Sequence, residues 1–450
     1  MGRLFGTDGI RGIFNQEPMT QETGYKVGRA VVGYFKGMAA RPRIVIGRDT
    51  RLSGKMLEKA IASGVLSMRA DPILLGEIPT PGVAYITKES GADAGIMISA
   101  SHNPYEYNGF KIFSDKGYKL TDEEELQIED LIFSDVTPIS FESKFDLGEE
   151  EHAYEELGMR YLSFLQRTLP EKTTFKDMKI ILDCANGATY RVAPALFERM
   201  GAEVESLFVS PDGKNINQEC GSQHPQTLCA RVLEKDADLG LAFDGDGDRL
   251  IAADEKGNVL TGDQVLIICA KTLKDRGELK NNLVVSTVMS NMGFRIALRE
   301  LGIEHISTKV GDRYVLEEMR TRKAILGGEE SGHIIFSQHH TTGDGLLSAQ
   351  QLVSAVQTSG RPLSALASMM TLFPQVLISV AVKTKPEISS VPELEEALQK
   401  VETSLGQRGR VLLRYSGTEP VCRIMVEGEH QEEIETYARQ IADVIREQLN

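Results

Sequence analysis

The sequence predicts an α/β protein with three similar mixed-sheet α/β domains and a C-terminal α+β domain, arranged around a central cleft. Two observations support this fold class. Apolar strands alternate with amphipathic helices three times, and each unit has a strand that runs into a polar or glycine-rich loop. The last stretch breaks this plan, because its strands are followed by one long amphipathic helix. A chain of 450 residues also exceeds what one hydrophobic core can organise.

The three repeated units each contain a strand, a helix and a second strand. Strands are expected at residues 43–47, 95–98, 179–183, 239–243, 283–286 and 324–327. Helices are expected at residues 55–68, 193–200 and 291–301. Strands alternating with helices favour mainly parallel pairing, and ligands of such sheets bind beyond the carboxyl ends of the strands. The loops after these strands are therefore the places to look for chemistry.

The C-terminal stretch is predicted as strands at residues 376–382, 409–413 and 422–427, followed by a helix at 431–449. Ile434, Ala438, Ile441 and Ile445 share one face of that helix. We predict domains at 1–145, 146–252, 253–370 and 371–450, with an acidic link that begins at residue 146.

Composition excludes several classes of partner. The formal net charge of −15 repels nucleic acid and anionic lipid. The five cysteines are odd in number and form no Cys-x-x-Cys pair, which indicates reduced thiols. No apolar run reaches the ~18 residues that a membrane span needs, and the first residues lack a signal-peptide pattern. We expect a cytoplasmic protein with no membrane or nucleic-acid partner; a homodimer stays open.

The first chemical motif is the loop from Ser99 to Pro104, which follows the strand at 95–98. Ser101 is a candidate nucleophile, although a serine hydroxyl needs assistance to react. His102 beside it and Lys111 shortly after are expected to supply positive charge, which a phosphorylated serine would require. The alternative is a polar turn in which Ser and Asn make local backbone hydrogen bonds.

The second motif places three carboxylates, Asp244, Asp246 and Asp248, directly after a strand and alternating with glycines. Such crowded carboxylates repel one another unless a cation is shared, and oxygen ligands select Mg²⁺ or Ca²⁺. An EF-hand calcium loop is a rival, since Glu255 falls at its twelfth position. That rival fails at the sixth position, where Arg249 replaces glycine. The simplest alternative is a solvated acidic turn.

Further loops carry groups suited to sugar and phosphate. The loop Gly328–His333 holds a carboxylate and a hydroxyl between glycines, but taken alone this weak signal favours a solvated acidic turn. The loop Arg414–Pro420, with Arg423 behind it, offers arginines, hydroxyls and a bare backbone to a non-reacting phosphate. Arg11 in the N-terminal loop and the basic loop 308–314 are additional candidates.

These motifs together resemble the α-D-phosphohexomutase superfamily over essentially the full chain. The Ser-His-Asn-Pro loop at Ser101, the Asp-Gly-Asp-Gly-Asp-Arg loop at Asp244, the Gly-Glu-x-Ser-Gly-His loop at Gly328 and the C-terminal Arg/Ser/Gly/Thr loop occur in family order. Other segments are most similar to the bacterial phosphoglucosamine mutase branch, namely 5–12, 215–222, 287–291, 310–315 and 341–345. Glu330 departs from the pattern, where Gln is more usual.

The resemblance implies an isomerase that interconverts glucosamine 6-phosphate and glucosamine 1-phosphate, on the route to UDP-N-acetylglucosamine. It implies a phosphorylated Ser101, a glucosamine 1,6-bisphosphate intermediate and one Mg²⁺ per chain, held by Ser101, Asp244, Asp246 and Asp248. The remaining catalytic roles fall on Arg11 and Arg249 for the phosphoryl group, and on Lys111 with His102 for proton transfer. A lysine base needs a lowered pKa, which neighbouring cations would provide.

The same resemblance implies a substrate-binding set of Glu329, Ser331, His333, Lys309, Arg313, Arg414, Ser416, Gly417, Thr418 and Arg423. The four predicted domains would then carry the phosphoserine loop, the metal site, the sugar-binding loop and the phosphate grip, in that order. The rival within the enzyme class is a phosphomannomutase or phosphoglucomutase. A rival of another class is a non-catalytic sugar-phosphate-binding protein, against which the intact serine, lysine and triple aspartate argue.

Overall fold

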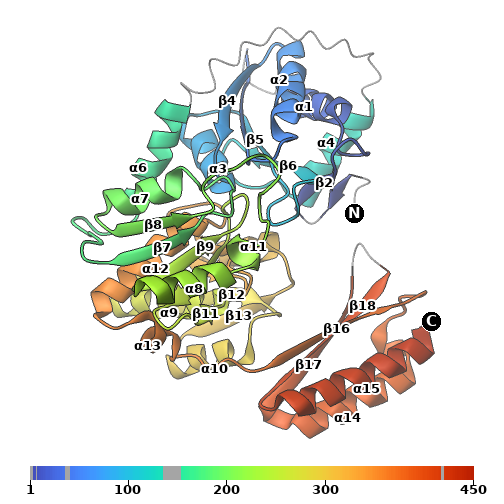
Figure 1. The fold of residues 1–450 in the computed structure, drawn as a ribbon. Coiled ribbons are helices and arrows are strands. Elements are labelled where there is room, and N and C mark those ends of the chain that lie inside the picture. The colour runs from blue at the N-terminus through green and yellow to red at the C-terminus, as the bar shows by residue number, and fades with distance from the viewer. Residues whose placement is uncertain (1–3, 7, 36–40, 135–153, 417–419, 450) are drawn as a thin grey trace. The chain divides into compact units, whose positions relative to one another are not determined.

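The computed structural model describes residues 4–6, 8–35, 41–134, 154–416 and 420–449. These form two compact units (Figure 1). The larger unit comprises residues 1–289 and 301–369, and the smaller one comprises 290–300 and 370–450.

The first sheet of the larger unit carries the serine loop. Its strand order is β1-β2-β6-β5-β3-β4, in which β3 pairs in parallel with β4 and β5 while the other pairs are antiparallel. The strands are β1 (Phe5–Gly6), β2 (Gly9–Ile13), β3 (Arg43–Arg48), β4 (Asp71–Glu77), β5 (Ala94–Ile98) and β6 (Tyr107–Ser114). The helices are α1 (Gln21–Phe35), α2 (Gly54–Ser67), α3 (Thr80–Glu89) and α4 (Asp122–Ser134).

The core of this layer lies between the sheet and α1, α2 and α4, while α3 covers the opposite face (Figure 1). Successive side chains of β3 alternate between the two faces, so Ile44 and Ile46 point into the first core. Helices α1 and α2 cross closely at two glycines. A Cβ atom on Gly28 would lie 2.3 Å from the Ile61 carbonyl oxygen, and one on Gly64 would lie 2.1 Å from the Tyr25 carbonyl oxygen.

Two further sheets complete the larger unit. One has the order β11-β10-β9-β7-β8 and the other β13-β12-β14-β15. Their strands are β7 (Lys179–Asp183), β8 (Glu203–Leu207), β9 (Leu239–Phe243), β10 (Leu250–Asp254), β11 (Val259–Leu260), β12 (Leu283–Thr287), β13 (Glu304–Thr308), β14 (Leu326–Gly328) and β15 (Ile334–Phe336). The accompanying helices are α6 (Met159–Arg167), α7 (Val192–Arg199), α8 (Gln226–Lys235), α9 (Gly262–Asp275), α11 (Asp312–Arg322), α12 (Gly345–Ser359) and α13 (Leu363–Ala367).

The smaller unit is an antiparallel sheet of order β16-β18-β17. Its strands are β16 (Gln375–Ala381), β17 (Gly409–Tyr415) and β18 (Val421–Gly428). Helices α14 (Pro392–Leu405) and α15 (Gln431–Leu449) lie side by side on one face (Figure 1). The predicted apolar face of the last helix is confirmed, since Ile434, Ala438, Ile441 and Ile445 are all buried.

The predicted fold class, including its mixed sheets, is confirmed, with differences in detail. The expected parallel pairing is present, and antiparallel strands such as β6 and β10 extend the parallel cores. Strand β14 begins at Leu326, two residues after its predicted start, and α14 was not predicted. Helix α10 (Met292–Glu300) groups with the smaller unit, where the Met292 N–H donates to Glu427 at 2.6 Å. The domain limits expected at 145, 252 and 370 stay predictions.

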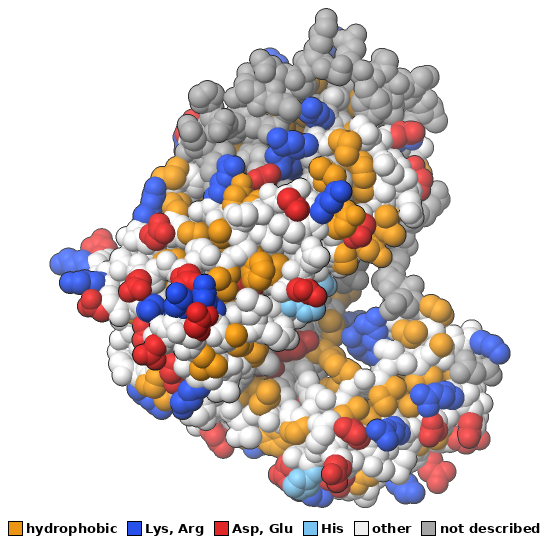
Figure 2. Space-filling view, viewed as in Figure 1, with side chains coloured by type: hydrophobic (Ala, Val, Ile, Leu, Met, Phe, Trp, Pro, Cys, Tyr) orange, Lys and Arg blue, Asp and Glu red, His pale blue; other side chains and the backbone are white. Residues whose placement is uncertain are grey.

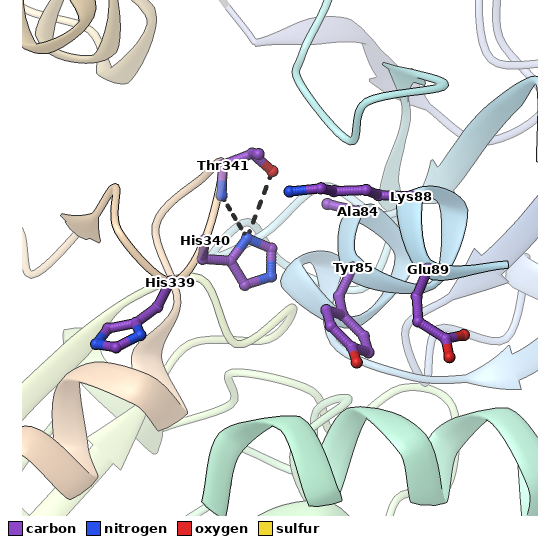
Figure 3. Close-up of a pocket in the computed structure, with 7 residues that line it drawn as sticks. All are labelled: Ala84, Tyr85, Lys88, Glu89, His339, His340 and Thr341. Carbon is purple, nitrogen blue, oxygen red and sulfur yellow. Dashed lines mark hydrogen bonds between the residues drawn. The ribbon is translucent and has the colours of Figure 1, made fainter. Parts of the chain in front are cut away.

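The loop 339–341 contacts α3 within the larger unit. His340 Nε2 lies 3.0 Å from the Pro81 carbonyl oxygen, and its Nδ1 accepts from the Thr341 N–H at 2.8 Å. Burial lowers the pKa of His340 to about 4, so this histidine is neutral at physiological pH. A cavity of about 230 Å³ lies here (Figure 3). It contains none of the site residues predicted from the sequence; its lining is Ala84, Tyr85, Lys88, Glu89, His339, His340 and Thr341.

The surface carries charged side chains of both signs, as the composition indicates (Figure 2). On the face drawn in Figure 2, acidic and basic side chains are mixed, with hydrophobic ones scattered between them. Among the described residues, no helix combines the length and the apolar character that crossing a bilayer requires.

The α1–α2 crossing generates a stability prediction. Gly64→Ala should destabilise the protein by about 1–3 kcal/mol, because the new methyl group meets backbone that cannot move aside. The matched control is Gly33→Ala on α1, where the nearest atom to a new Cβ is 3.7 Å away. Replacing an exposed helical glycine by alanine should leave stability unchanged or raise it. Thermal unfolding of both variants checks this; equal midpoints would refute the close crossing.

Candidate active site

The serine loop begins where β5 ends, in a strained and buried conformation. Ser101 is 1% exposed and has a φ of 54°, a left-handed value that is uncommon for a residue other than glycine. Its N–H donates to Ser99 Oγ at 2.9 Å, and Ser99 Oγ in turn donates to Asp49 Oδ2 at 2.5 Å. These bonds to β3 and β5 hold the backbone in a shape that it would not adopt alone.

Arg51 is the main support of this loop. Its guanidinium is fully buried and is paired with Asp49, the Nε–Oδ2 distance being 2.8 Å. The other guanidinium nitrogens donate to backbone carbonyl oxygens of the loop, namely those of Ser101 (2.9 Å), Asn103 (2.8 Å), Tyr107 (3.0 Å) and Pro104. Arginine alone offers five N–H donors in one rigid plane, so no other side chain could bind these carbonyl oxygens in the same way.

The aspartate loop after β9 meets the serine loop directly. Ser101 Oγ donates to Asp244 Oδ2 at 2.6 Å. The close approach needs Gly245, because a Cβ atom there would lie 2.5 Å from the Ser101 carbonyl oxygen. Asn217 adds a further link, since its Nδ2 donates to that same carbonyl oxygen at 2.9 Å. The predicted nucleophile and the predicted metal ligands therefore share one site.

Asp244, Asp246 and Asp248 fit a divalent cation. Each can offer an oxygen such that all three lie within 4.8 Å of one another, and all three residues are buried. Oδ1 of Asp246 and Oδ1 of Asp248 are buried without a hydrogen-bond partner among the described residues, which is costly for a carboxylate. Burial and the neighbouring Asp248 and Asp246 raise the pKa of Asp244 well above its ordinary value. A hard cation such as Mg²⁺ would relieve this crowding.

The secondary structure on either side of the aspartate loop excludes an EF-hand calcium loop. It runs between strands β9 and β10, whereas an EF-hand loop runs between helices. Glu255 accepts hydrogen bonds from the N–H and hydroxyl groups of Ser364 instead of facing the aspartates. The loop is therefore not an EF-hand.

Lys111 reaches the same carboxylates from β6. Its Nζ lies 2.8 Å from Asp246 Oδ2, 3.3 Å from Asp248 Oδ2 and 3.2 Å from Asp8 Oδ2. Burial alone disfavours the ammonium, but Asp246, Asp8 and Asp248 outweigh it and raise the pKa of Lys111 well above its ordinary value. The lowered pKa expected from the sequence is therefore not observed, because the nearest groups are anions.

The other three predicted catalytic residues surround this cluster. His102 Nδ1 lies 3.4 Å from Ser101 Oγ. Burial, Arg249 and Arg11 lower the pKa of His102 to about 4, so it is neutral near pH 7 and does not supply the expected positive charge. The Arg249 backbone N–H donates to Asp244 Oδ1 at 3.1 Å, its guanidinium Nε lies 3.8 Å from Asp248 Oδ1, and Arg11 pairs with Asp8. The positive charge comes from these arginines and Lys111.

The loop after β14 approaches the aspartates through His333. Its Nδ1 lies 3.6 Å from Asp248 Oδ2, and its Nε2 accepts from the Gly343 N–H at 3.1 Å. Glu329 is largely buried and accepts from the Gly311 N–H at 3.0 Å. Burial raises the pKa of Glu329. Ser331 in the same loop is half-buried, so this loop presents a carboxylate, a hydroxyl and an imidazole beside the cluster.

Two residues predicted for substrate binding lie elsewhere in the larger unit. Arg313 pairs with Glu125 at 2.8 Å and with Asp122, both on α4. Lys309 is exposed just after β13. The structure does not bring either residue to the aspartate cluster.

The predicted phosphate grip belongs to the smaller unit. Arg414 on β17 stands directly opposite Arg423 on β18. Two like charges at one cross-strand position are unfavourable unless anions accompany them. Ser416 is buried, and its carbonyl oxygen accepts from Lys385 Nζ at 2.6 Å. The predicted residues Gly417 and Thr418 lie outside the described residues.

Sequence reasoning missed the supporting residues Asp49, Arg51, Asn217 and Thr80, the last of which donates to Asp246 Oδ2 at 2.5 Å. The sequence did contain a signal for two of them, Asp49 and Arg51. The polar run Arg48–Arg51 follows the buried strand β3, at the same sheet edge as the serine loop.

The loop support generates the second prediction. Arg51→Lys should lower catalytic activity about 10- to 100-fold, because one ammonium cannot bind four diverging carbonyl oxygens and a shift of ~1 Å is enough for such a loss. The control is Arg43→Lys at the start of β3, the strand that precedes Arg51, because Arg43 is exposed. Steady-state kinetics on both variants decides the point. Full activity in Arg51→Lys would show that the guanidinium does not shape the loop.

Comparison with known proteins agrees with this geometry. Four models of the phosphoglucomutase/phosphomannomutase family match in order: α/β/α domain I at residues 2–137, domain II at 159–257, domain III at 261–373 and the C-terminal domain at 377–444. Among solved structures, a phosphoglucomutase/phosphomannomutase family protein from Burkholderia thailandensis has a TM-score of 0.79 at 22% identity, covering 99% of this chain and 98% of that one. Aspergillus fumigatus N-acetylphosphoglucosamine mutase, solved with GlcNAc-6P and magnesium, has a TM-score of 0.67 at 16% identity, covering 99% and 95%.

Curated relatives are much more similar. The phosphoglucosamine mutase of Syntrophus aciditrophicus is 57% identical over 449 residues, covering 100% of both chains. That of Geobacillus kaustophilus is 50% identical, covering 100% of this chain and 99% of the other. The resemblance inferred from the motifs is thereby confirmed. The chain belongs to the phosphoglucosamine mutase family of the α-D-phosphohexomutase superfamily.

Proposed function

We propose that this protein interconverts glucosamine 6-phosphate and glucosamine 1-phosphate through a phosphorylated Ser101. The observation that carries the proposal is the 2.6 Å contact between Ser101 Oγ and Asp244, inside a buried cluster of three aspartates. A serine that is only structural has no need for three clustered, buried carboxylates beside it. Membership of the phosphoglucosamine mutase family supports the choice of sugar.

The reaction is a relay of two phosphoryl transfers. The bond between phosphorus and Ser101 Oγ breaks, and a bond forms between phosphorus and O1 of glucosamine 6-phosphate. The O1 hydroxyl gives up its proton, and glucosamine 1,6-bisphosphate results. After the bisphosphate turns over, its C6 phosphoryl group passes to Ser101, O6 takes up a proton, and glucosamine 1-phosphate leaves. The phosphoserine is regenerated, so no external phosphate is consumed.

Charge neutralisation is the main task of the surrounding groups. Asp244, Asp246, Asp248 and the phosphoserine oxygen would hold one Mg²⁺. When bound, the ion would offset negative charge on the phosphoryl oxygens and on the three carboxylates. Arg249 and Arg11 are placed to add positive charge at the transferring group, since the Arg249 guanidinium lies 3.8 Å from Asp248 Oδ1 and that of Arg11 contacts the Ala100 carbonyl oxygen.

Lys111 is our candidate for proton transfer to and from the sugar hydroxyl. In the geometry described, its raised pKa makes it an ammonium at neutral pH, which suits the donation step. The removal step requires a lower pKa, and that follows if the charge of Asp246 and Asp248 is neutralised. The neutral His102 would support this exchange as a hydrogen-bonding partner beside Ser101.

Substrate binding is divided between the sugar and its distal phosphate. Glu329, Ser331 and His333 would bind sugar hydroxyls in both orientations of the bisphosphate. The distal phosphate would be held by Arg414, Ser416, Gly417, Thr418 and Arg423. Lys309 and Arg313 are weaker candidates, because Lys309 is exposed and Arg313 is paired with α4.

The proposal predicts that the active protein carries one phosphate group on Ser101. Ser101→Ala should lose that phosphate, and its turnover of glucosamine 6-phosphate should fall by about 10⁴-fold or more, as expected for loss of a nucleophile. Intact-protein mass spectrometry and a coupled assay for glucosamine 1-phosphate measure both effects.

Ser134→Ala is the matched control, because Ser134 is an exposed hydroxyl at the end of α4 in the same region of the chain. It should keep both the phosphate and the activity. Normal mutase activity in Ser101→Ala would disprove the relay, and a wild-type protein that never accepts phosphate from glucosamine 1,6-bisphosphate would do the same.

A further inference from the structure

Residues 117–125, which we call the bridging segment, run from the turn after β6 into the first turn of α4 and contact helix α11. The guanidinium carbon of Arg320 stands 4.8 Å from the ring centroid of Tyr118. Lys119 Nζ lies 2.6 Å from Asp312 Oδ2, and Arg313 pairs with Glu125 at 2.8 Å. Three side chains of α11 are thus bound by one short segment that follows the strand of Lys111.

Lys119 is largely buried and joins two carboxylates. Its Nζ lies 2.6 Å from Asp8 Oδ1 and 2.6 Å from Asp312 Oδ2, while only 12% of its side chain is exposed. Burial opposes the charged form, but Asp312 and Asp8 outweigh it and raise the pKa of Lys119. The ammonium therefore stands between two anions that would otherwise face each other.

Each of those carboxylates continues to a residue of the candidate active site. Asp8 Oδ2 lies 3.2 Å from Lys111 Nζ, and Asp312 Oδ2 lies 3.5 Å from His333 Nε2. Asp312 also begins α11, and the preceding Gly311 donates its N–H to Glu329 at 3.0 Å. Lys119 consequently connects the sheet of Lys111 with the loop that contains Glu329 and His333.

We infer that Lys119 is a positioning residue for phosphoryl transfer to the sugar, fixing Glu329 and His333 relative to Lys111 through Asp8 and Asp312. The inference rests on the proposed function and deepens it. It assigns a role to a lysine outside all the recognised motifs, at a distance from the transferring phosphate.

Loss of the Lys119 ammonium should slow one reaction of the phosphoenzyme and leave the other unchanged. Without the ammonium, Asp8 and Asp312 repel each other, and the start of α11 shifts away from the Lys111 strand. The serine loop is held by Arg51 and Asp49, neither of which contacts Lys119. Transfer from phospho-Ser101 to a sugar should therefore suffer, whereas attack by water on the same phosphoserine should not.

The experiment compares two fates of the phosphoenzyme. Wild-type, Lys119→Met and Lys119→Arg proteins are phosphorylated with glucosamine 1,6-bisphosphate, and the loss of phosphate is followed with and without glucosamine 6-phosphate. In Lys119→Met, transfer to the sugar should slow by about 10- to 100-fold, while loss to water is unchanged. Lys119→Arg should recover most of the transfer rate. The control is Lys116→Met, which replaces an exposed lysine directly before the bridging segment and should behave as wild type.

Three outcomes would overturn the inference: equal transfer rates in Lys119→Met and wild type, a parallel loss of the sugar and water reactions, or no recovery in Lys119→Arg. If Lys119→Met does not fold, Asp312→Asn breaks the same bridge and should also slow only the sugar reaction. Failure of the proposed function is recognised separately, because the wild-type phosphoenzyme itself would then not transfer phosphate to glucosamine 6-phosphate.

Discussion

The hydrogen bond from Ser101 Oγ to Asp244 Oδ2 joins two loops that are 143 residues apart in the chain. Each loop follows a buried strand, β5 or β9, and each reaches the other because glycine at position 245 leaves room for the Ser101 backbone. The pairing concentrates three carboxylates around one hydroxyl. Such a cluster is unfavourable on its own, so the rest of the site is arranged to compensate its negative charge.

That compensation explains the positions of the buried charged groups around the cluster. Lys111 lies against Asp246, Asp248 and Asp8, and Asp8 in turn pairs with Arg11 and Lys119. The alternation of cations and anions continues through Lys119 to Asp312 and on to His333. Phosphoryl transfer needs this kind of preorganised charge, because the phosphate oxygens carry negative charge throughout the reaction.

Much of this could be predicted from the sequence, because motifs at strand ends are local. The strands before Ser101 and Asp244, the mixed α/β class and the apolar face of α15 all followed from periodicity and loop composition. The three aspartates were recognisable as candidate metal ligands because three carboxylates within five residues repel one another unless a cation is shared.

Other features depend on contacts between distant segments and leave no local pattern. The role of Arg51 depends on carbonyl oxygens of residues about 50 positions away, and a sequence does not show where carbonyls point. The pKa values of Lys111 and His102 were predicted wrongly for the same reason. The prediction considered residues nearby in the sequence, whereas the pKa values depend on burial and on the charged groups nearby in space. Arg313 resembled a ligand for phosphate, yet α4 supplies its carboxylate partners.

The central claim is that Ser101, once phosphorylated, shares one divalent cation with Asp244, Asp246 and Asp248. Replacing Mg²⁺ by Mn²⁺ allows electron paramagnetic resonance to detect hyperfine coupling between the ion and the phosphorus of phosphoserine. The account predicts one tightly bound Mn²⁺ per chain with clear phosphorus coupling, which disappears when Ser101 is dephosphorylated. Mn²⁺ that binds at this cluster without any phosphorus coupling in the phosphoenzyme would contradict it.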